Sequence, residues 1–354
     1  MSRFLSSRLA SFTPYTPGEQ PRERQYIKLN TNESPFPPAP GVIEAAARAA
    51  ARLELYPDPD ARDLLRALAD RFSLREDQLI LTNGSDEVLN FAFLAFGDAE
   101  HPLAFPDITY GFYPVIAALN GVPYREIPVK EDLSVDPEAY LDHPGPIVLA
   151  NPNAPTGLAL PLSAIRQLLE AHPERLVIVD EAYVDFGGES ALPLIRHYPN
   201  LLVTQTFSKS RSLAGARLGF GAADPAIIRD LNTVKYSTNP YNINRMTAAA
   251  ALASLERDDY NLQNCLTIRE TREETAAALR ALGFTVLPSL TNFLFVRHDR
   301  IGGEELYLAL KARGILIRHF SVERIRDYDR ITIGSRAQMD ALLAAVREIL
   351  EETI

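Results

Sequence analysis

The sequence has few of the residues that stabilise secreted proteins or bind metals. Its 354 residues include one cysteine, Cys265, three methionines and no tryptophan. A single cysteine cannot form an internal disulfide, which favours a reducing, cytoplasmic location. The six histidines are scattered rather than paired at ligand spacing, so the sequence predicts no zinc site and no other metal.

Long apolar runs and an excess of positive charge are also missing. No window approaches the roughly 18 unbroken apolar residues of a membrane span. Lysine and arginine together number 36 against 46 acidic residues, a formal net charge of −10. This balance argues against nucleic-acid and anionic-membrane partners, although a local basic pocket for a small anion stays possible.

The N-terminal residues resemble an organelle transit peptide in composition only. Residues 1–18 are rich in serine, contain Arg3 and Arg8, and have no acid before Glu19. However, residues 11–18 are punctuated by proline and glycine, which is not the pattern of an amphipathic helix. We therefore expect an ordered arm lying over the body of the protein.

Short apolar runs alternate with helical patterns from about residue 40 to residue 260. Buried strands are predicted at 78–82, 103–105, 147–150, 176–179, 201–206 and 218–222. Helices are predicted at 41–53, 61–72, 87–96, 162–171 and 225–234. This alternation is typical of an α/β fold in which helices cover both faces of a mostly parallel central sheet.

The remaining residues predict a smaller lobe. A connecting helix at 261–282 precedes strands at 292–297, 315–318 and 330–333 and helices at 304–313 and 338–351. We therefore expect three parts. They are an arm or lid at 1–35 associated with the small lobe, a large α/β domain at 36–260, and a small C-terminal α+β domain at 261–354.

Lysine is rare, and one of the five lysines lies in a distinctive segment. Lys209 follows the strand predicted at 201–206, where ligands bind in open α/β sheets. The hydroxyls of Thr206, Ser208, Ser210 and Ser212, together with Arg217, would form a phosphate cradle around it. A lone Ser-Lys pair is more often part of a solvated loop, but the ten-residue string TFSKSRSLAG at 206–215 is far more specific. It resembles the attachment motif for pyridoxal phosphate in the class I and II aminotransferases, which implies the fold type I architecture and a covalent, catalytic role for Lys209.

Two further residues match the same family. Asp180 follows the strand predicted at 176–179, and Tyr183 comes three residues later. The resemblance implies that Asp180 keeps the ring nitrogen of the cofactor protonated and that Tyr183 reaches its ring hydroxyl. Taken alone, the acidic pair at 180–181 would suit a helix start or a solvated turn.

A strand-to-helix turn supplies a candidate phosphate site. Gly84, Ser85 and Asp86 lie there, and amides at the start of a helix bind phosphate with the help of the helix dipole. By itself this motif is a plain helix cap. Tyr110 matches the family's aromatic that stacks on the cofactor ring, although a single tyrosine is more often a core residue.

One position departs from the family. The segment 151–157, NPNAPTG, resembles the family's Asn-Pro-Thr-Gly turn, but Ala154 stands where the cofactor-contacting asparagine is expected. Either one hydrogen bond to the ring hydroxyl is missing or Asn153 supplies it. A lost neutral hydrogen bond costs about 1 kcal/mol, too little to abolish cofactor binding.

The segments 14–18, 29–36 and 55–59 are similar to histidinol-phosphate aminotransferases, and the resemblance extends over nearly the whole chain. It implies a homodimer in which Tyr56 reaches the cofactor phosphate of the neighbouring subunit. It also implies that Arg330 holds the α-carboxylate of glutamate and that Arg318 holds a second anion, either the distal carboxylate or the substrate phosphate. Tyr15 and Asn32 are then substrate contacts.

The implied reaction is transamination between histidinol phosphate and 2-oxoglutarate, yielding imidazole-acetol phosphate and glutamate, with no metal. Threonine-phosphate decarboxylase remains an alternative, although the His-Gly-Gly segment usual at its start is not found. An aromatic-amino-acid aminotransferase is excluded only weakly. A non-catalytic pyridoxal-phosphate-binding regulator would normally carry a helix-turn-helix module, for which we see no room ahead of Tyr15. A nucleotide-binding protein fits worst, because no dinucleotide or Walker motif occurs.

Overall fold

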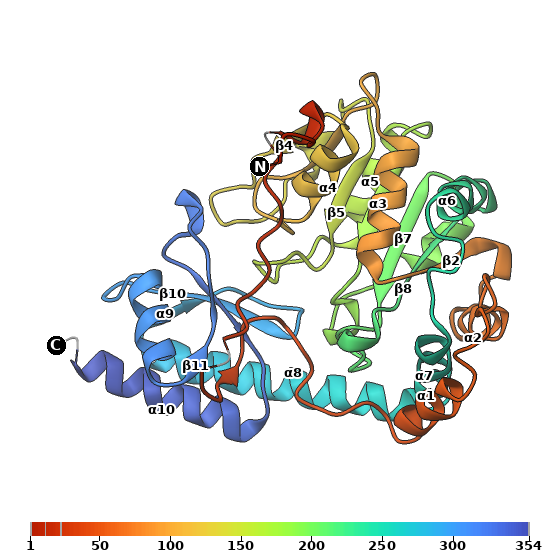
Figure 1. Cartoon of the computed structure of the whole chain (residues 1–354). Coiled ribbons are helices and arrows are strands. Elements are labelled where there is room, and N and C mark those ends of the chain that lie inside the picture. Colours follow the sequence, from red (N-terminus) through yellow and green to blue (C-terminus); the bar gives the residue numbers. More distant parts are fainter. Residues whose placement is uncertain (1, 11, 22, 353–354) are drawn as a thin grey trace.

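The main layer of the computed structural model, which describes residues 2–10, 12–21 and 23–352, is a seven-stranded sheet (Figure 1). Its strand order is β2-β8-β7-β6-β5-β3-β4. Four pairings are parallel, and the two that involve β8 are antiparallel. The strands are β2 (Leu79–Thr82), β3 (Leu103–Pro106), β4 (Tyr124–Ile127), β5 (Ile147–Ala150), β6 (Val177–Asp180), β7 (Leu201–Thr206) and β8 (Gly219–Ala223). This confirms the predicted, mostly parallel α/β sheet.

Helices cover both faces of this sheet. Its central strands are therefore buried on both sides, as is usual for parallel strands. The helices up to the small lobe are α1 (Val42–Ala50), α2 (Arg62–Phe72), α3 (Ser85–Phe96), α4 (Tyr113–Asn120), α5 (Leu162–Ala171), α6 (Pro225–Thr238) and α7 (Arg245–Leu255). Short 3-10 helices lie at Ser7–Leu9, Glu76–Gln78, Pro137–Tyr140, Val184–Phe186, Leu192–Arg196, Ala214–Ala216 and Glu323–Ile325.

Three elements between residues 36 and 260 were not predicted from the sequence: β4, α4 and α7. Edge strand β4 exposes three consecutive residues and so lacks the alternation of a half-buried strand. Helix α4 is short, and α7 is rich in alanine with no distinct apolar face. The long helix α8 (Asp258–Ala281) begins three residues earlier than predicted, where the Asp258 carboxylate pairs with the arginines Arg71 and Arg211.

The small lobe contains a four-stranded antiparallel sheet of order β12-β13-β10-β9 packed on α8 and on the helices α9 (Gly303–Ala312) and α10 (Arg336–Glu352). Its strands are β9 (Phe284–Val286), β10 (Phe293–His298), β12 (Arg318–His319) and β13 (Asp329–Thr332). The single strand predicted at 315–318 is wrong. The chain forms β11 (Ile315–Leu316), bends at the buried Ile317, and continues as β12 in another sheet.

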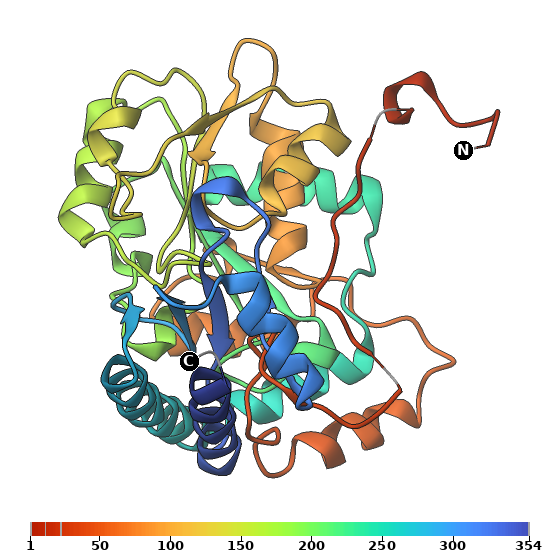
Figure 2. The same ribbon diagram turned by 90° about the vertical axis from the view of Figure 1, so that its left-hand side faces the viewer.

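The N-terminal segment runs down one side of the molecule to the small lobe, while its first residues extend away from the body (Figure 2). There β1 (Ile27–Lys28) pairs in parallel with β11. Leu29 is buried within the apolar core of the small lobe. Within the described part of the chain, no helix is both long and apolar enough to cross a membrane. The same residues contain no cluster of three or more His, Cys, Asp or Glu side chains arranged to hold a metal.

Candidate active site

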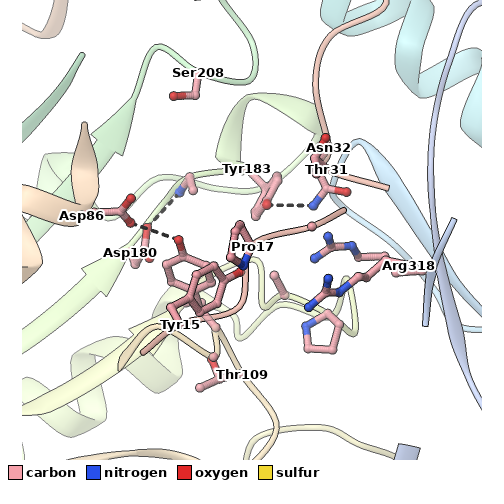
Figure 3. A pocket seen from close by; sticks show the side chains of 18 of the residues that line it. Tyr15, Pro17, Thr31, Asn32, Asp86, Thr109, Asp180, Tyr183, Ser208 and Arg318 are labelled. Atoms are coloured by element: carbon pink, nitrogen blue, oxygen red, sulfur yellow. Dashed lines mark hydrogen bonds between the residues drawn. The ribbon is translucent and has the colours of Figure 1, made fainter. Parts of the chain in front are cut away.

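A pocket of about 790 Å³ opens where the carboxyl ends of β5, β6 and β7 face the small lobe and the N-terminal arm. Figure 3 shows Asp86 and Asp180 on one side of it and Arg318 on the other, with Tyr15 and Pro17 between them. Most of the predicted site residues line it: Tyr15, Asn32, Ser85, Asp86, Tyr110, Asp180, Tyr183, Thr206, Ser208, Lys209, Arg217, Arg318 and Arg330. The fold thus brings together residues that are as much as 315 positions apart (330 − 15).

Asp180 is a buried carboxylate at the end of β6. Its Oδ2 accepts a hydrogen bond of 2.9 Å from the Tyr113 hydroxyl, and its Oδ1 accepts one of 3.3 Å from the Ala182 amide. Burial raises the pKa of Asp180 to about 6 despite these bonds. A carboxylate in this state is stabilised by any cation placed beside it, such as a protonated pyridine nitrogen.

Lys209 projects into the pocket from the loop after β7. Its Nζ donates a 3.1 Å hydrogen bond to the Thr31 carbonyl and lies 5.8 Å from the centre of the Tyr183 ring. Within the described residues, no carboxylate forms an ion pair with this amine. The flanking Ser210 hydroxyl donates to Asp185, which anchors the loop on the side away from the pocket.

Tyr183 is oriented by Asn32. The Asn32 side chain donates to the Tyr183 hydroxyl at 2.9 Å and accepts from the Thr332 hydroxyl at 2.9 Å (Figure 3). Asn32 has a positive φ of 57°, a conformation that asparagine tolerates better than most residues. Both polar atoms of the Asn32 side chain are thus hydrogen-bonded, so Asn32 fixes the position of the Tyr183 hydroxyl as well as lining the pocket.

The turn between β2 and α3 packs closely against β8. A Cβ atom at Gly219 would lie 2.3 Å from the Ser85 nitrogen, so only glycine permits β8 to approach the start of α3. Gly84 has φ +85° and does not itself line the pocket, but it places the first helical amides. Arg217 lies 3.5 Å from Asp86 and 3.4 Å from the Ser208 hydroxyl.

Tyr110 forms one wall of the same region. Its hydroxyl donates to Asp86 Oδ1 at 3.1 Å, and its ring packs at right angles on Tyr113 with the ring centres 5.6 Å apart. Burial, reinforced by the negative charge of Asp86, raises the pKa of Tyr110 well above its usual value. Tyr110 is therefore a neutral aromatic face held by a hydrogen bond at its far end.

Asn153 does not line the pocket. Its Oδ1 accepts from the Thr109 hydroxyl at 2.7 Å, while its Nδ2 donates to the Ile108 carbonyl and the Thr156 hydroxyl, each at 3.0 Å. Ala154, by contrast, lines the pocket. Asn153 therefore supports the 108–109 loop, and no amide side chain stands at the position where the family's asparagine is expected.

The small lobe supplies two arginines whose positive charge is not neutralised by a carboxylate in the described residues. Arg330 donates to the Asn30 carbonyl at 3.1 Å, its Nε has no partner there, and burial lowers its pKa. Arg318 neighbours it directly across the β12–β13 pairing. The Phe320 ring lies 5.8 Å from both guanidinium carbons. Two adjacent cations without counterions are suited to an incoming anion.

Comparison with known proteins identifies the family. The model for aminotransferase class I and II matches residues 24–346. Histidinol-phosphate aminotransferase 2 of Dechloromonas aromatica (strain RCB) is 49% identical over 99% of both chains. This chain belongs to the histidinol-phosphate aminotransferase group of the class I and II aminotransferases.

Two solved structures share the fold of this chain. The histidinol-phosphate aminotransferase of Sinorhizobium meliloti, solved in complex with pyridoxal 5′-phosphate, matches with a TM-score of 0.86 and 29% identity. The match covers 94% of this chain and 93% of that one. The L-threonine-O-3-phosphate decarboxylase of Porphyromonas gingivalis matches with a TM-score of 0.82 at 24% identity, over 92% and 99% of the two chains. At that identity the second likeness shows the shared fold alone.

The residues that line the pocket of this aminotransferase match the chemical groups of pyridoxal phosphate. The buried Asp180 carboxylate suits a protonated ring nitrogen, and the Tyr183 hydroxyl can face a ring hydroxyl. The tight Gly84–Ser85 turn, with Thr206, Ser208 and Arg217, suits a phosphate, and the Lys209 amine suits an aldehyde. Each polar feature of the cofactor thus has a matching group in the pocket.

Four predicted site residues do not line this pocket. Gly84 contributes a backbone turn beside it, while Ser210, Ser212 and Tyr56 lie outside it. The Tyr56 side chain is 79% exposed, and its ring stacks on Tyr241 with the ring centres 4.6 Å apart. The predicted contact of Tyr56 with a neighbouring subunit remains a prediction.

Sequence reasoning missed three contributors to the site. Tyr113 holds Asp180, the Thr31 carbonyl holds Lys209, and Phe320 packs against both arginines. Tyr113 begins helix α4, and a tyrosine at a helix start has the pattern of a core residue, so no sequence signal singled it out. A backbone carbonyl such as that of Thr31 has no side-chain signature.

Proposed function

We propose that this chain is a pyridoxal-phosphate-dependent aminotransferase that interconverts L-histidinol phosphate plus 2-oxoglutarate with imidazole-acetol phosphate plus L-glutamate, in histidine biosynthesis. The observation that carries the proposal is one pocket that joins a lysine amine, a buried carboxylate and two cations without counterions: Lys209, Asp180, Arg318 and Arg330. The relative that is 49% identical over nearly the whole chain supports the substrate.

Seven side chains and one turn would hold the cofactor. Asp180 would face the ring nitrogen, Tyr183 the ring hydroxyl, and Tyr110 one face of the ring. The phosphate would be held by the Gly84–Ser85–Asp86 turn with Thr206, Ser208 and Arg217, and Lys209 would provide the covalent attachment. When bound, pyridoxal phosphate withdraws electrons from the substrate carbon that bears the amine.

The protein residues then have distinct tasks. Asp180, kept from water and fixed by Tyr113, favours a protonated ring nitrogen, which strengthens that electron withdrawal. The Lys209 amine would act as the base that takes the proton from the amine-bearing carbon of the substrate. Its only hydrogen-bond partner in the described residues is a carbonyl, so its lone pair is not engaged by another donor.

The two arginines would select the anionic ends of both substrates. Arg330 would hold the α-carboxylate of glutamate as a planar fork. Arg318, beside it, would hold either the distal carboxylate or the phosphate of histidinol phosphate. Tyr15 and Asn32 would line the substrate from the arm side.

We also propose a homodimer and a cytoplasmic location. The exposed Tyr56–Tyr241 stack supports a second copy at this surface, where Tyr56 would reach the neighbouring phosphate site. Mixing Lys209→Ala with Tyr56→Ala subunits tests this directly. A shared site predicts that mixed dimers recover activity that neither variant has, whereas self-contained sites predict no recovery.

The absorbance spectrum of the purified protein tests the proposed function. We expect a visible band from lysine-bound cofactor that is lost on adding histidinol phosphate and restored by 2-oxoglutarate, and that is missing in Lys209→Ala. A band that responds to phosphothreonine or phenylalanine instead would favour the decarboxylase or the aromatic aminotransferase. No band after adding pyridoxal phosphate would overturn the proposal, and a band without turnover of any amine would favour a regulator.

A further inference from the structure

The arm segment Tyr15–Glu19, which we call the strap, crosses the mouth of the pocket between the two lobes. At one end, the Tyr15 ring packs edge-on against Phe112, with the ring centres 5.2 Å apart. At the other end, Glu19 reaches α9 of the small lobe. Pro17 and Gly18 between these ends line the pocket, as Tyr15 does. Figure 3 shows Tyr15 and Pro17 there.

Glu19 forms the small-lobe end of the strap. One carboxylate oxygen accepts a hydrogen bond from the Tyr307 hydroxyl, and the other accepts one of 2.6 Å from Lys311 Nζ. Burial acts to raise the pKa of Glu19, but the hydrogen bonds from Lys311 and Tyr307 outweigh it, so this pKa lies below its ordinary value. The pKa of Lys311 is raised, first by its bond to Glu19. The pair is therefore charged at neutral pH.

The strap packs directly on residues 30–32, the segment that contacts Lys209 and Tyr183. A Cβ atom at Gly18 would lie 2.5 Å from Thr31 Cγ2, and the Asn30 amide donates to the Glu19 carbonyl at 2.9 Å. The Thr31 carbonyl in turn accepts from Lys209. The inner segment 30–32 thus lies between the strap and the catalytic lysine.

We propose that Glu19 is a positioning residue, which holds the strap across the pocket and thereby sets the affinity for the substrates. The inference rests on the proposed function, because it concerns the same pocket. Arm residues 13–17 are exposed, and Glu19 with its two partners supplies the polar contacts between the strap side chains and the small lobe. Without this anchor, every binding event must also order the strap, which costs conformational entropy.

The anchor is built to be reversible. The side chains of Lys311 and Glu19 are 30% and 36% exposed, and exposed ion pairs are weak. A strap held by such a pair can open for substrate entry and close again afterwards. Lys209 and Asp180, in contrast, are held by contacts that do not involve Glu19, so the chemical step is expected to be preserved when the anchor is lost.

The test compares Glu19→Ala with Glu352→Ala. Glu352 forms a similar surface pair with Arg313 at the end of the same helix α9, but away from the strap. For Glu19→Ala we expect KM for both substrates to rise roughly five-fold with kcat within about two-fold, as loss of uniform binding requires. Amide hydrogen exchange across residues 12–24 should accelerate in the cofactor-free protein as well. Glu352→Ala should change neither quantity.

Glu19→Ala could perturb the arm beyond the loss of this ion pair. A charge swap tests the proposal in that case too. The double variant Glu19→Lys with Lys311→Glu restores the ion pair with its signs exchanged, and should recover KM and slow exchange relative to either single variant. Unchanged exchange in Glu19→Ala, or a fall in kcat at constant KM, would overturn the inference. If the unmodified protein does not turn over histidinol phosphate, the proposed function fails, and the exchange measurement still decides whether Glu19 anchors the strap.

Discussion

The two halves of the pocket are built differently. The half formed by the large domain consists of strand ends and tight turns, and its central carboxylate, Asp180, is 4% exposed and held by Tyr113. The half formed by the small lobe and the arm contains Arg318 and Arg330, whose charges have no acidic partner in the described residues, and a strap anchored by a surface ion pair.

This difference matches two kinds of ligand. A rigid, mutually hydrogen-bonded half suits a cofactor that stays in place, because its geometry is already fixed before chemistry begins. A half with unpaired cations and a reversible anchor suits substrates that enter and leave in every turnover. Variants in the first half should therefore affect the chemical step or the stability of the protein, and variants in the second half mainly affinity.

The largest effect is expected for Lys209→Ala in the rigid half. Loss of the amine that moves the proton should reduce kcat by roughly 10²–10⁴-fold from general base catalysis alone. Steady-state kinetics with both substrates measures this loss, and Lys130→Ala, which removes a surface lysine paired with Asp136, is the matched control. A variant that keeps more than a tenth of the activity would exclude Lys209 as the catalytic amine.

The second prediction concerns pH and the stability of the cofactor-free protein. Asp180 has a pKa of about 6 in the folded chain against 3.8 for the unperturbed group. Because the folded pKa is the higher one, its contribution is fully present below about pH 4 and is lost as the pH rises through about 6. The shift corresponds to about 3 kcal/mol of unfolding free energy.

Denaturant unfolding of the cofactor-free protein between pH 4 and 8 measures this slope. Asp180→Asn should flatten it, while the neighbouring buried acid Glu181, whose pKa burial raises to about 7, still contributes a slope of its own. Glu181→Gln is therefore the matched comparison, because that side chain bonds Ser190 and Gln205 instead of lining the pocket. Equal slopes in Asp180→Asn and the unmodified protein would contradict the prediction.

The third prediction moves to the substrate half. Arg330→Lys replaces a planar fork with a point charge and should raise KM for glutamate about ten-fold, with a smaller change in kcat. Arg326→Lys, at an exposed pair with Glu323, is the control. Arg318→Lys then resolves the open assignment. A KM effect confined to glutamate indicates the distal carboxylate, and an effect confined to histidinol phosphate indicates the phosphate.

The difference between the two halves also explains which parts of the site could be predicted from the sequence. The rigid half was largely predictable, because buried parallel strands are short apolar runs and the polar residues that follow them must meet at one edge of the sheet. Asp180 ends β6, Tyr183 follows it, and Lys209 follows β7. The side-chain partner Tyr113 was not predictable, since a tyrosine at a helix start has the same pattern as a core residue.

The half formed by the small lobe and the arm depends on contacts between residues far apart in the chain. Glu19 meets Tyr307 and Lys311 across almost 300 positions, and no local pattern indicates such a pair. The bend at Ile317 could not be inferred either, because residues 315–317 are all buried and show no alternation. The orientation of Asn153 was equally hidden, since it depends on the Ile108–Thr109 loop.

The smallest effect is expected where the rigid half departs from its family, at Ala154. Ala154→Asn places an amide in the pocket, where Asn153 does not reach. A donor facing the ring hydroxyl would draw negative charge from that oxygen, which would then stabilise less the protonated nitrogen that joins Lys209 to the cofactor. A bond worth about 1 kcal/mol should lower the pH midpoint of the visible band by about 0.7 units, with kcat changed only a few-fold.

Spectral titration measures this shift, and Ala154→Val controls for size without adding a donor. An equal shift in both variants would indicate crowding instead of a hydrogen bond. No shift in either would indicate that Tyr183 alone sets the charge on that oxygen.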